Sequence, residues 1–160
     1  MPTNRRNRAG WTAICGLFIC LSVMTLGASG AYADMKAADA ARKAGQYEKA
    51  RAAYIALAEK GDAKAQYRLG DLLRKGQGGK RDDKRALYWY RKAGIGGDAR
   101  AQIRLGEFYR TGKSVPMDPG VAVSWYRKAA QAGNAWGELR LGEMYRMGQG
   151  VEQDLGEAAK

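Results

Sequence analysis

The sequence has 160 residues, of which 46% are hydrophobic and 28% are charged, and its formal net charge is +12 at pH 7. This length allows one ordinary domain or a short array of repeats. Because the chain contains no histidine, it lacks the commonest general base and the commonest metal ligand, which excludes histidine-dependent hydrolytic triads and histidine metal sites. The positive charge favours anionic partners.

Residues 1–33 are predicted to form a secretory signal peptide. The opening MPTNRRNRAG carries three arginines and no acid, the apolar run WTAICGLFICLSVMTLG follows, and small residues lead to Ala31-Tyr32-Ala33. A basic region, an apolar region and an A-x-A site are the three parts of such a signal. We therefore expect cleavage between Ala33 and Asp34 and a periplasmic or secreted product. An uncleaved anchor helix is the alternative, although the apolar run is shorter than the about 20 residues that span a bilayer.

Both cysteines, Cys15 and Cys20, lie in the apolar part of the predicted signal. The processed chain would contain no disulfide, although small exported domains often depend on disulfides. Lipidation of Cys20 is a second interpretation, but bulky Ile19 stands before it where a small residue is expected. Removal of the signal would lower the net charge to +9.

A repeat with a period of 36 residues fills the rest of the chain. RLGDLLRKG begins at Arg68, RLGEFYRTG at Arg104 and RLGEMYRMG at Arg140. Apolar residues at helical spacing on both sides of a glycine-rich segment predict a first helix, a turn and a second helix in each unit. The expected units are a degenerate tetratricopeptide-like unit at 34–61, full repeats at 62–97 and 98–133, and a partial repeat at 134–160.

Glycines recur inside and after each predicted first helix. Gly70 and Gly106 cost about 1 kcal/mol each in helix propensity relative to alanine, so we expect them to permit the close approach of a neighbouring helix. Gly76 is predicted to end its helix in the left-handed conformation that glycine adopts easily.

Capping signals predict where the second helices begin. Asp118 and Pro119 fit the N-cap and first helical position, and Asp154 with Glu157 fits a capping box. The second helices also carry the aromatic pairs Trp89-Tyr90 and Trp125-Tyr126. Their helical spacing predicts a packed core between repeats rather than a ligand-stacking platform.

The segment AQIRLGEFYRTGKSVPMDPGVAVSWYRKAAQAG resembles the Sel-like repeat (SLR), a relative of the tetratricopeptide repeat. The shared pattern is A-x-x-x-L-G-x-x-Y, a glycine-rich turn, an aspartate and a W-Y-x-x-A-A-x-x-G helix. The resemblance covers essentially the whole processed chain. It implies an all-α, right-handed α-solenoid of stacked helix-turn-helix repeats. It also implies a protein-binding scaffold, which in bacteria is often an exported adaptor in envelope, polysaccharide or signalling systems.

Arginines recur on the polar face of each predicted first helix. The candidate partner-binding residues are Arg68, Arg74, Arg104, Arg110, Arg140 and Arg146. An acidic row lies between them at Asp71, Glu107 and Glu143. Pairs of opposite charge three residues apart contribute roughly 0.2–0.5 kcal/mol each, so one interpretation is a solvated face that pairs with itself. In the other interpretation, first helices line the concave side as in tetratricopeptide arrays, and two guanidinium groups per carboxylate bind partner carboxylates or phosphates.

The expected function is an exported interaction scaffold that binds an acidic segment of another envelope protein in a basic concave groove. A binder of an anionic glycan or lipid head group on the same arginines is the alternative. Enzyme activity is not expected, because Ser114 and Ser124 have no histidine to activate them. No cofactor, metal ligand cluster or nucleic-acid module is expected either.

The repeat phase predicts a further Trp-Tyr pair at the two positions after Lys160, where the sequence ends. Repeat arrays normally finish with a polar capping unit, which this sequence lacks. We expect either a piece of a longer array or an open C-terminal end that meets a partner or a second copy of the chain.

Overall fold

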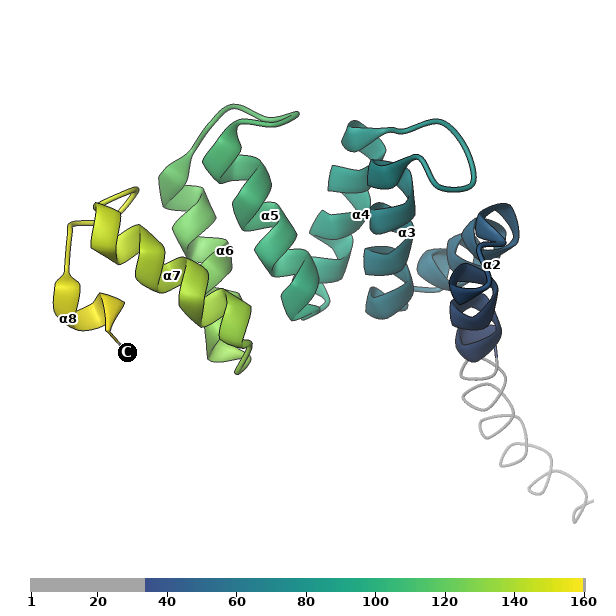
Figure 1. Cartoon of the computed structure of the whole chain (residues 1–160), viewed down its shortest axis with the longest axis horizontal. Helices are drawn as coiled ribbons and strands as arrows, with labels where there is room; N and C mark the ends of the chain where they lie inside the picture. Colours follow the sequence, from purple (N-terminus) through teal and green to yellow (C-terminus); the bar gives the residue numbers. More distant parts are fainter. Residues whose placement is uncertain (1–33, 160) are drawn as a thin grey trace, which may run out of the picture.

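The computed structural model describes residues 34–159 (Figure 1). The predicted signal peptide, with both cysteines, lies outside these residues. Between 34 and 159 every regular element is an α-helix and none is a strand, beginning with a helical segment over residues 34–43. The helices that follow are α2 (Tyr47–Glu59), α3 (Ala63–Lys75), α4 (Asp83–Ile95), α5 (Ala99–Thr111), α6 (Pro119–Gln131), α7 (Ala135–Met147) and α8 (Leu155–Ala158).

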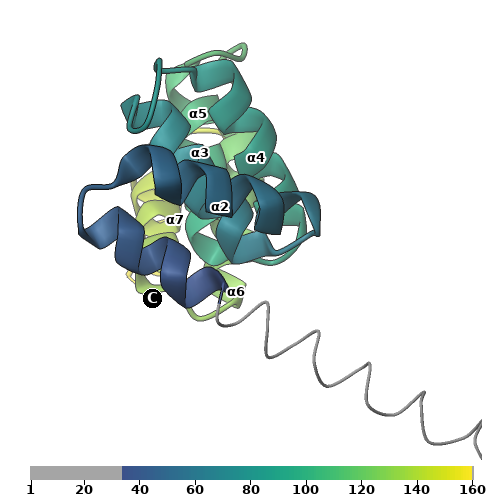
Figure 2. The same ribbon diagram turned by 90° about the vertical axis from the view of Figure 1, so that its right-hand side faces the viewer.

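The helices form hairpins that stack in chain order. Helix α3 packs on α4, α5 on α6 and α7 on α8, and each hairpin contacts the next one. The end-on view in Figure 2 places the first helices α3, α5 and α7 on one side of the stack and α4 and α6 on the other. This arrangement confirms the predicted all-α solenoid, and it brings the arginine-bearing helices onto one face.

Each recurring glycine of a complete unit lies under a tyrosine ring of the second helix. A Cβ atom built on Gly70 would lie 2.8 Å from Cε1 of Tyr90, and one built on Gly106 would collide with the ring of Tyr126. Both tyrosines are fully buried. The predicted close approach is therefore confirmed, and its cause is an aromatic side chain that fills the space of a missing Cβ.

Side-chain caps define the start of the helices. Asp62, Asp98 and Asn134 cap the first helices α3, α5 and α7. Asp82, Asp118 and Asp154 cap the second helices α4, α6 and α8. The predicted start at Asp118-Pro119 and the predicted left-handed end at Gly76 (φ 69°) are confirmed. Asp154 acts as the N-cap, and its own N–H donates to the carbonyl oxygen of Tyr145 at 3.1 Å.

The hydrophobic core runs along the stack. A large cluster extends from Met35 to Phe108, and a smaller one contains Ala122, Val123, Tyr126 and Met144. Trp89 is buried, whereas Trp125 is half-buried and its ring is covered by the Lys128 ammonium group 4.4 Å from the ring centroid. The aromatic pairs therefore belong to the core, as predicted, except for the outer face of Trp125.

No helix within residues 34–159 is long and apolar enough to cross a membrane. The expected Trp-Tyr pair of the last unit falls after the end of the sequence. In that unit, a Cβ on Gly142 would lie 3.1 Å from the carbonyl oxygen of Ala158 instead of meeting a tyrosine ring.

Candidate partner-binding site

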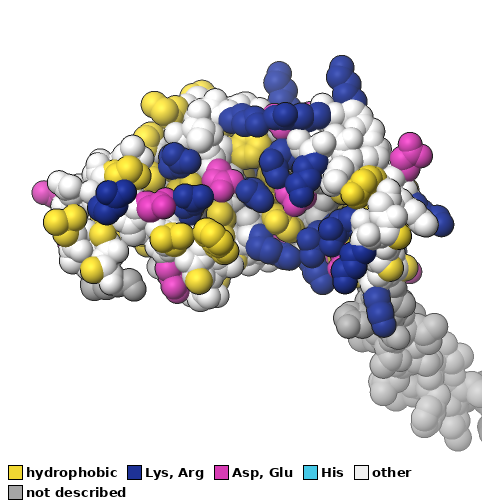
Figure 3. Space-filling model, viewed as in Figure 1, with side chains coloured by type: hydrophobic (Ala, Val, Ile, Leu, Met, Phe, Trp, Pro, Cys, Tyr) yellow, Lys and Arg dark blue, Asp and Glu magenta, His cyan; other side chains and the backbone are white. Residues whose placement is uncertain are grey.

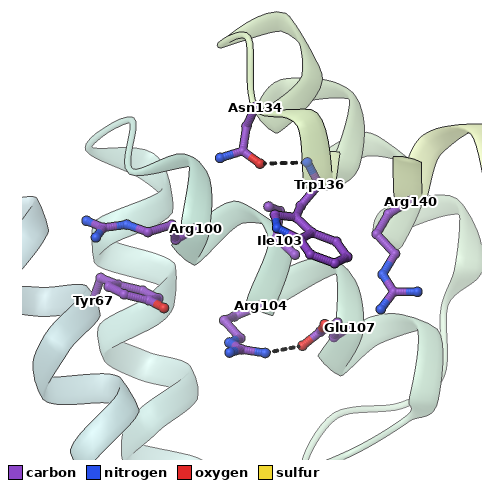
Figure 4. A pocket seen from close by; sticks show the side chains of 8 residues that line it. All are labelled: Tyr67, Arg100, Ile103, Arg104, Glu107, Asn134, Trp136 and Arg140. Carbon is purple, nitrogen blue, oxygen red and sulfur yellow. Dashed lines mark hydrogen bonds and ion pairs between the residues drawn. The ribbon is translucent and has the colours of Figure 1, made fainter. Parts of the chain in front are cut away.

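A hollow of about 290 Å³ opens on the face of the first helices, and we name it the central hollow (Figure 4). Its lining comes from α3, α5, α7 and the cap of α7. The lining residues are Tyr67, Arg100, Ile103, Arg104, Glu107, Asn134, Trp136 and Arg140. In Figure 3, Lys and Arg side chains gather on the same face over α3 and α5. The hollow thus joins three consecutive units.

One wall of the hollow is an arginine stacked on a tyrosine. The Arg100 guanidinium carbon lies 4.5 Å from the centroid of the Tyr67 ring. Oδ2 of Asp98 forms an ion pair of 2.6 Å with Nη2 of Arg100. Oδ1 of Asp98 accepts hydrogen bonds from the backbone N–H groups of Arg100 and Ala101 at the helix start. The hydrogen bond to Asp98 raises the pKa of Arg100. The residue that caps α5 therefore also orients a cation at the site.

The floor contains arginines that pair with acids of their own helix. Arg104 Nη1 lies 2.9 Å from Glu107 Oε2, and Arg140 Nη1 lies 2.8 Å from Glu143 Oε2. Burial alone would lower the pKa of Arg104. The hydrogen bond to Glu107 and the charge of Glu107 have the larger combined effect, so the pKa of Arg104 is raised. The two arginines are therefore cations that stay protonated and are oriented by these partners.

Acids also connect each unit to its neighbours. Asp71 accepts a 2.8 Å hydrogen bond from Oη of Tyr90 and lies 3.6 Å from Arg74 Nη2 and 3.9 Å from Nε of Arg104 in the next unit. Burial and the charge of Asp71 raise the pKa of Tyr90. Each such acid therefore fixes a tyrosine in its own unit and an arginine in the next.

The same arrangement occurs once more, earlier in the chain. Asp39 accepts a 2.6 Å hydrogen bond from Oη of Tyr54, and Arg68 Nε lies 3.5 Å from Asp39 Oδ1. Although burial opposes its charge, the Tyr54 hydrogen bond and the nearby cations, with Arg68 the foremost, lower the pKa of Asp39. Spacing in the sequence predicts that Arg68 pairs with Asp71, and this pairing is wrong, because the stack places Asp39 of the preceding unit beside Arg68.

Only two of the six predicted arginines, Arg104 and Arg140, line the central hollow. Arg68 and Arg74 belong to the acid networks on the same face. Arg110 lies near the buried hydroxyl group of Tyr126, and Arg146 is exposed at a second hollow on α7 and α8. The six arginines recur regularly in the sequence, but pairing across units gives them different surroundings in the structure.

Two lining residues, Arg100 and Trp136, are absent from the predicted set. Trp136 is 63% exposed, although tryptophan is usually well buried. It stands at the repeat position that Lys64 and Arg100 occupy in the earlier units. The sequence signal for Trp136 as a site residue is therefore an aromatic residue at a repeat position that cations occupy in the earlier units.

The hollow is rich in arginine and partly apolar. It contains three arginines and one glutamate, with Ile103 half-buried beside the exposed ring of Trp136. A guanidinium group has five N–H donors, and Arg104 and Arg140 each donate one hydrogen bond to a residue between 34 and 159. Donors therefore remain for a carboxylate or phosphate. No group of acidic residues within 34–159 could hold a metal ion.

A family model for the Sel1 repeat matches residues 63–98, 99–134 and 137–160. The chain is similar to the crystal structure of c5321, a protective antigen of uropathogenic Escherichia coli strains with an SLR fold, at 33% identity and a TM-score of 0.68. It is also similar to a Sel1 repeat protein from Oxalobacter formigenes, at 33% identity and a TM-score of 0.73. These matches cover 70% and 76% of this chain but 24% and 50% of the other two.

No curated protein matches the sequence. Sel1 repeat proteins generally act as protein–protein interaction scaffolds and are typically not enzymes. The three matched repeats span most of the helical stack, and both solved structures share its fold. The chain therefore belongs to the Sel1 repeat family.

Proposed function

We propose that this chain is an exported scaffold that binds an acidic segment of another bacterial envelope or signalling protein in the central hollow. The observation that carries the proposal is that three arginines, Arg100, Arg104 and Arg140, line one hollow whose lining holds a single carboxylate, that of Glu107. Stacked repeats commonly use such extended surfaces to hold partner segments.

The charge of the hollow favours a carboxylate-bearing partner. Arg104 and Arg140 are oriented by Glu107 and Glu143, so less side-chain entropy is lost when a ligand binds. Their remaining N–H groups can form charge-assisted hydrogen bonds, which are roughly twice as strong as neutral ones. Acidic side chains of a partner therefore have fixed donors to meet.

The aromatic side chains favour a peptide with an apolar residue beside its acids. Trp136 and Ile103 lie on facing helices, and the stacked Tyr67–Arg100 pair forms the adjacent wall (Figure 4). Tryptophan and arginine are the residue types that most often dominate binding energy at protein interfaces. A partner segment that inserts one large apolar side chain next to Trp136 would use both features.

Export is supported by the sequence of residues 1–33, which combines three arginines, an apolar run and Ala31-Tyr32-Ala33. Cleavage at Ala33 would release a chain with a net charge of +9. That charge suits partners in an anionic envelope.

The test is selection of a random peptide library on the purified protein. We expect the bound peptides to be enriched in Asp and Glu next to one aromatic or large aliphatic residue. The double variant Trp136→Ala, Arg140→Gln should lose at least tenfold in affinity for them, because it removes the apolar anchor and one cation.

The matched control is Tyr88→Ala, Arg127→Gln, which removes one exposed aromatic residue and one exposed arginine from the second helices. Circular dichroism checks that both variants remain folded. Selected peptides without acidic residues, or equal loss of affinity in both variants, would overturn the proposal.

A further inference from the structure

We propose that a second surface, separate from the central hollow, docks the protein on an anionic membrane surface. This surface, which we name the basic edge, joins the turn before α4 to the turn before α6. Its residues are Lys80, Arg81, Lys84, Arg85, Lys113 and Met117.

Cations outnumber acids at the basic edge, and both acids are already engaged. Asp82 Oδ1 accepts the backbone N–H of Arg85 at 2.9 Å as the N-cap of α4. Asp83 pairs with Arg81 at 2.8 Å and with Lys113 at 3.5 Å, and the hydrogen bond from Arg81 lowers the pKa of Asp83 although partial burial opposes this shift. The acids therefore organise the turn and leave cationic charge for an external partner.

Three of these cations are free. Lys80, Lys84 and Arg85 are exposed, and none forms an ion pair with a residue in the described range 34–159. They line a shallow hollow of about 430 Å³ together with Arg51, whose Nη1 donates to the carbonyl oxygen of Gly78.

The repeat itself shows that the fold does not need these cations. Residues 36 positions later occupy the same places in the next unit, and they are uncharged: Pro116, Met117, Gly120 and Val121. The unit after that has Glu152, Gln153, Gly156 and Glu157 there. In all three units the aspartate at the same position still caps the second helix. Lys80, Arg81, Lys84 and Arg85 therefore occur together in one unit only, and the requirements of folding do not explain them.

The neighbouring turn adds an exposed apolar side chain. Met117 is 67% exposed, and the Lys113–Asp83 ion pair joins its turn to the basic one. Figure 1 shows both turns at the same edge of the stack, and Figure 3 shows Lys and Arg side chains along that edge. A row of cations beside one projecting apolar side chain matches the interface of an anionic bilayer, where the cations meet head groups and the apolar group reaches the acyl boundary.

A membrane accounts for these features better than a soluble acidic protein. The cations lie around a shallow hollow on a projecting edge of the stack, so they can meet many head groups of a broad surface at once. Each Lys or Arg near an anionic bilayer strengthens binding about fivefold. The three free cations should together contribute on the order of a hundredfold at low ionic strength.

The experiment uses the full chain with Cys15→Ser and Cys20→Ser and a polarity-sensitive fluorophore on Met117→Cys. The probe reports whether this edge enters a bilayer, regardless of how residues 1–33 behave. It is mixed with vesicles of phosphatidylglycerol and phosphatidylcholine in equal parts, or with vesicles of phosphatidylcholine alone. We expect a blue shift with the anionic vesicles only, reversed by high salt.

Two triple variants separate the basic edge from general charge. The first variant carries Lys80→Gln, Lys84→Gln and Arg85→Gln. It should need on the order of a hundredfold more anionic lipid for the same blue shift of the fluorophore. The second variant carries Lys36→Gln, Lys43→Gln and Lys60→Gln, which remove three exposed lysines elsewhere. It should need the same amount of anionic lipid as the parent chain. Equal shifts with neutral vesicles, no shift with anionic ones, or equal losses in both variants would overturn the proposal. A response to soluble polyglutamate without one to vesicles would assign the edge to an acidic protein instead.

Discussion

The ring of Tyr126 lies directly against Gly106, so that the second helix of this unit fills the space where any other residue of the first helix would carry a Cβ atom. Tyr90 and Gly70 repeat the contact one unit earlier. This contact explains why a helix-weakening residue recurs inside helices that carry the candidate site.

Gly106→Leu should destabilise the stack by at least about 2 kcal/mol, because overpacking a filled core forces backbone shifts. For a domain of this size the melting temperature should fall by roughly 5–10 °C. Gly142→Leu is the control, since its added Cβ meets a terminal carbonyl oxygen rather than a buried ring. Equal melting temperatures for the two variants in a calorimetric scan would show that the glycine–tyrosine contact does not limit packing.

Tyr90→Phe should cost about 1 kcal/mol, because it removes the 2.8 Å hydrogen bond that Asp71 accepts. Tyr126→Phe is the matched control, since the buried Tyr126 hydroxyl lies near Arg110 but has no partner at hydrogen-bond distance and angle in the described range. Its removal should leave the free energy of unfolding unchanged or raise it. Urea unfolding of both variants measures the difference, and a larger loss for Tyr126→Phe would contradict the assignment.

Stability should decline in alkaline solution partly through Tyr54. Burial and the hydrogen bond to Asp39 raise the pKa of Tyr54 from 10 to about 12. The folded chain therefore keeps a proton that the unfolded chain loses, and this stabilisation is present below pH 10 and lost as the pH rises to about 12. Melting temperatures of Tyr54→Phe should fall less steeply over this interval than those of the wild type or of the control Tyr88→Phe. Parallel curves for all three proteins would exclude this role of Tyr54.

Export predicts a processed chain that begins at Asp34. N-terminal sequencing of the protein from a periplasmic fraction should read Asp34-Met35-Lys36. Ala31→Asp with Ala33→Asp should block processing because small residues are needed at these positions, whereas Tyr32→Leu between them should not. An intact N-terminus on the wild-type chain would favour the anchor-helix alternative.

The repeat period was enough to predict the hairpins, the caps and the close approach at Gly70 and Gly106, because each depends on residues within one unit. The candidate site could be predicted only in part. Arg68 pairs with Asp39 and not with Asp71, since the offset between stacked helices decides which acid faces it. Trp136 belongs to the site because the stack brings residues of α3, α5 and α7 around one hollow, which residue spacing within one helix does not reveal.

Site-specific photo-crosslinking at position 136 shows whether a partner protein binds in the central hollow. A photoreactive phenylalanine analogue replaces Trp136 in the producing cell, with the exposed Tyr88 position as the control. We expect a specific cross-linked protein at position 136 only, joined through an acidic segment that mass spectrometry identifies. This product should be lost with Arg140→Gln. The same products from both positions, or a cross-linked segment without acidic residues, would contradict this expectation.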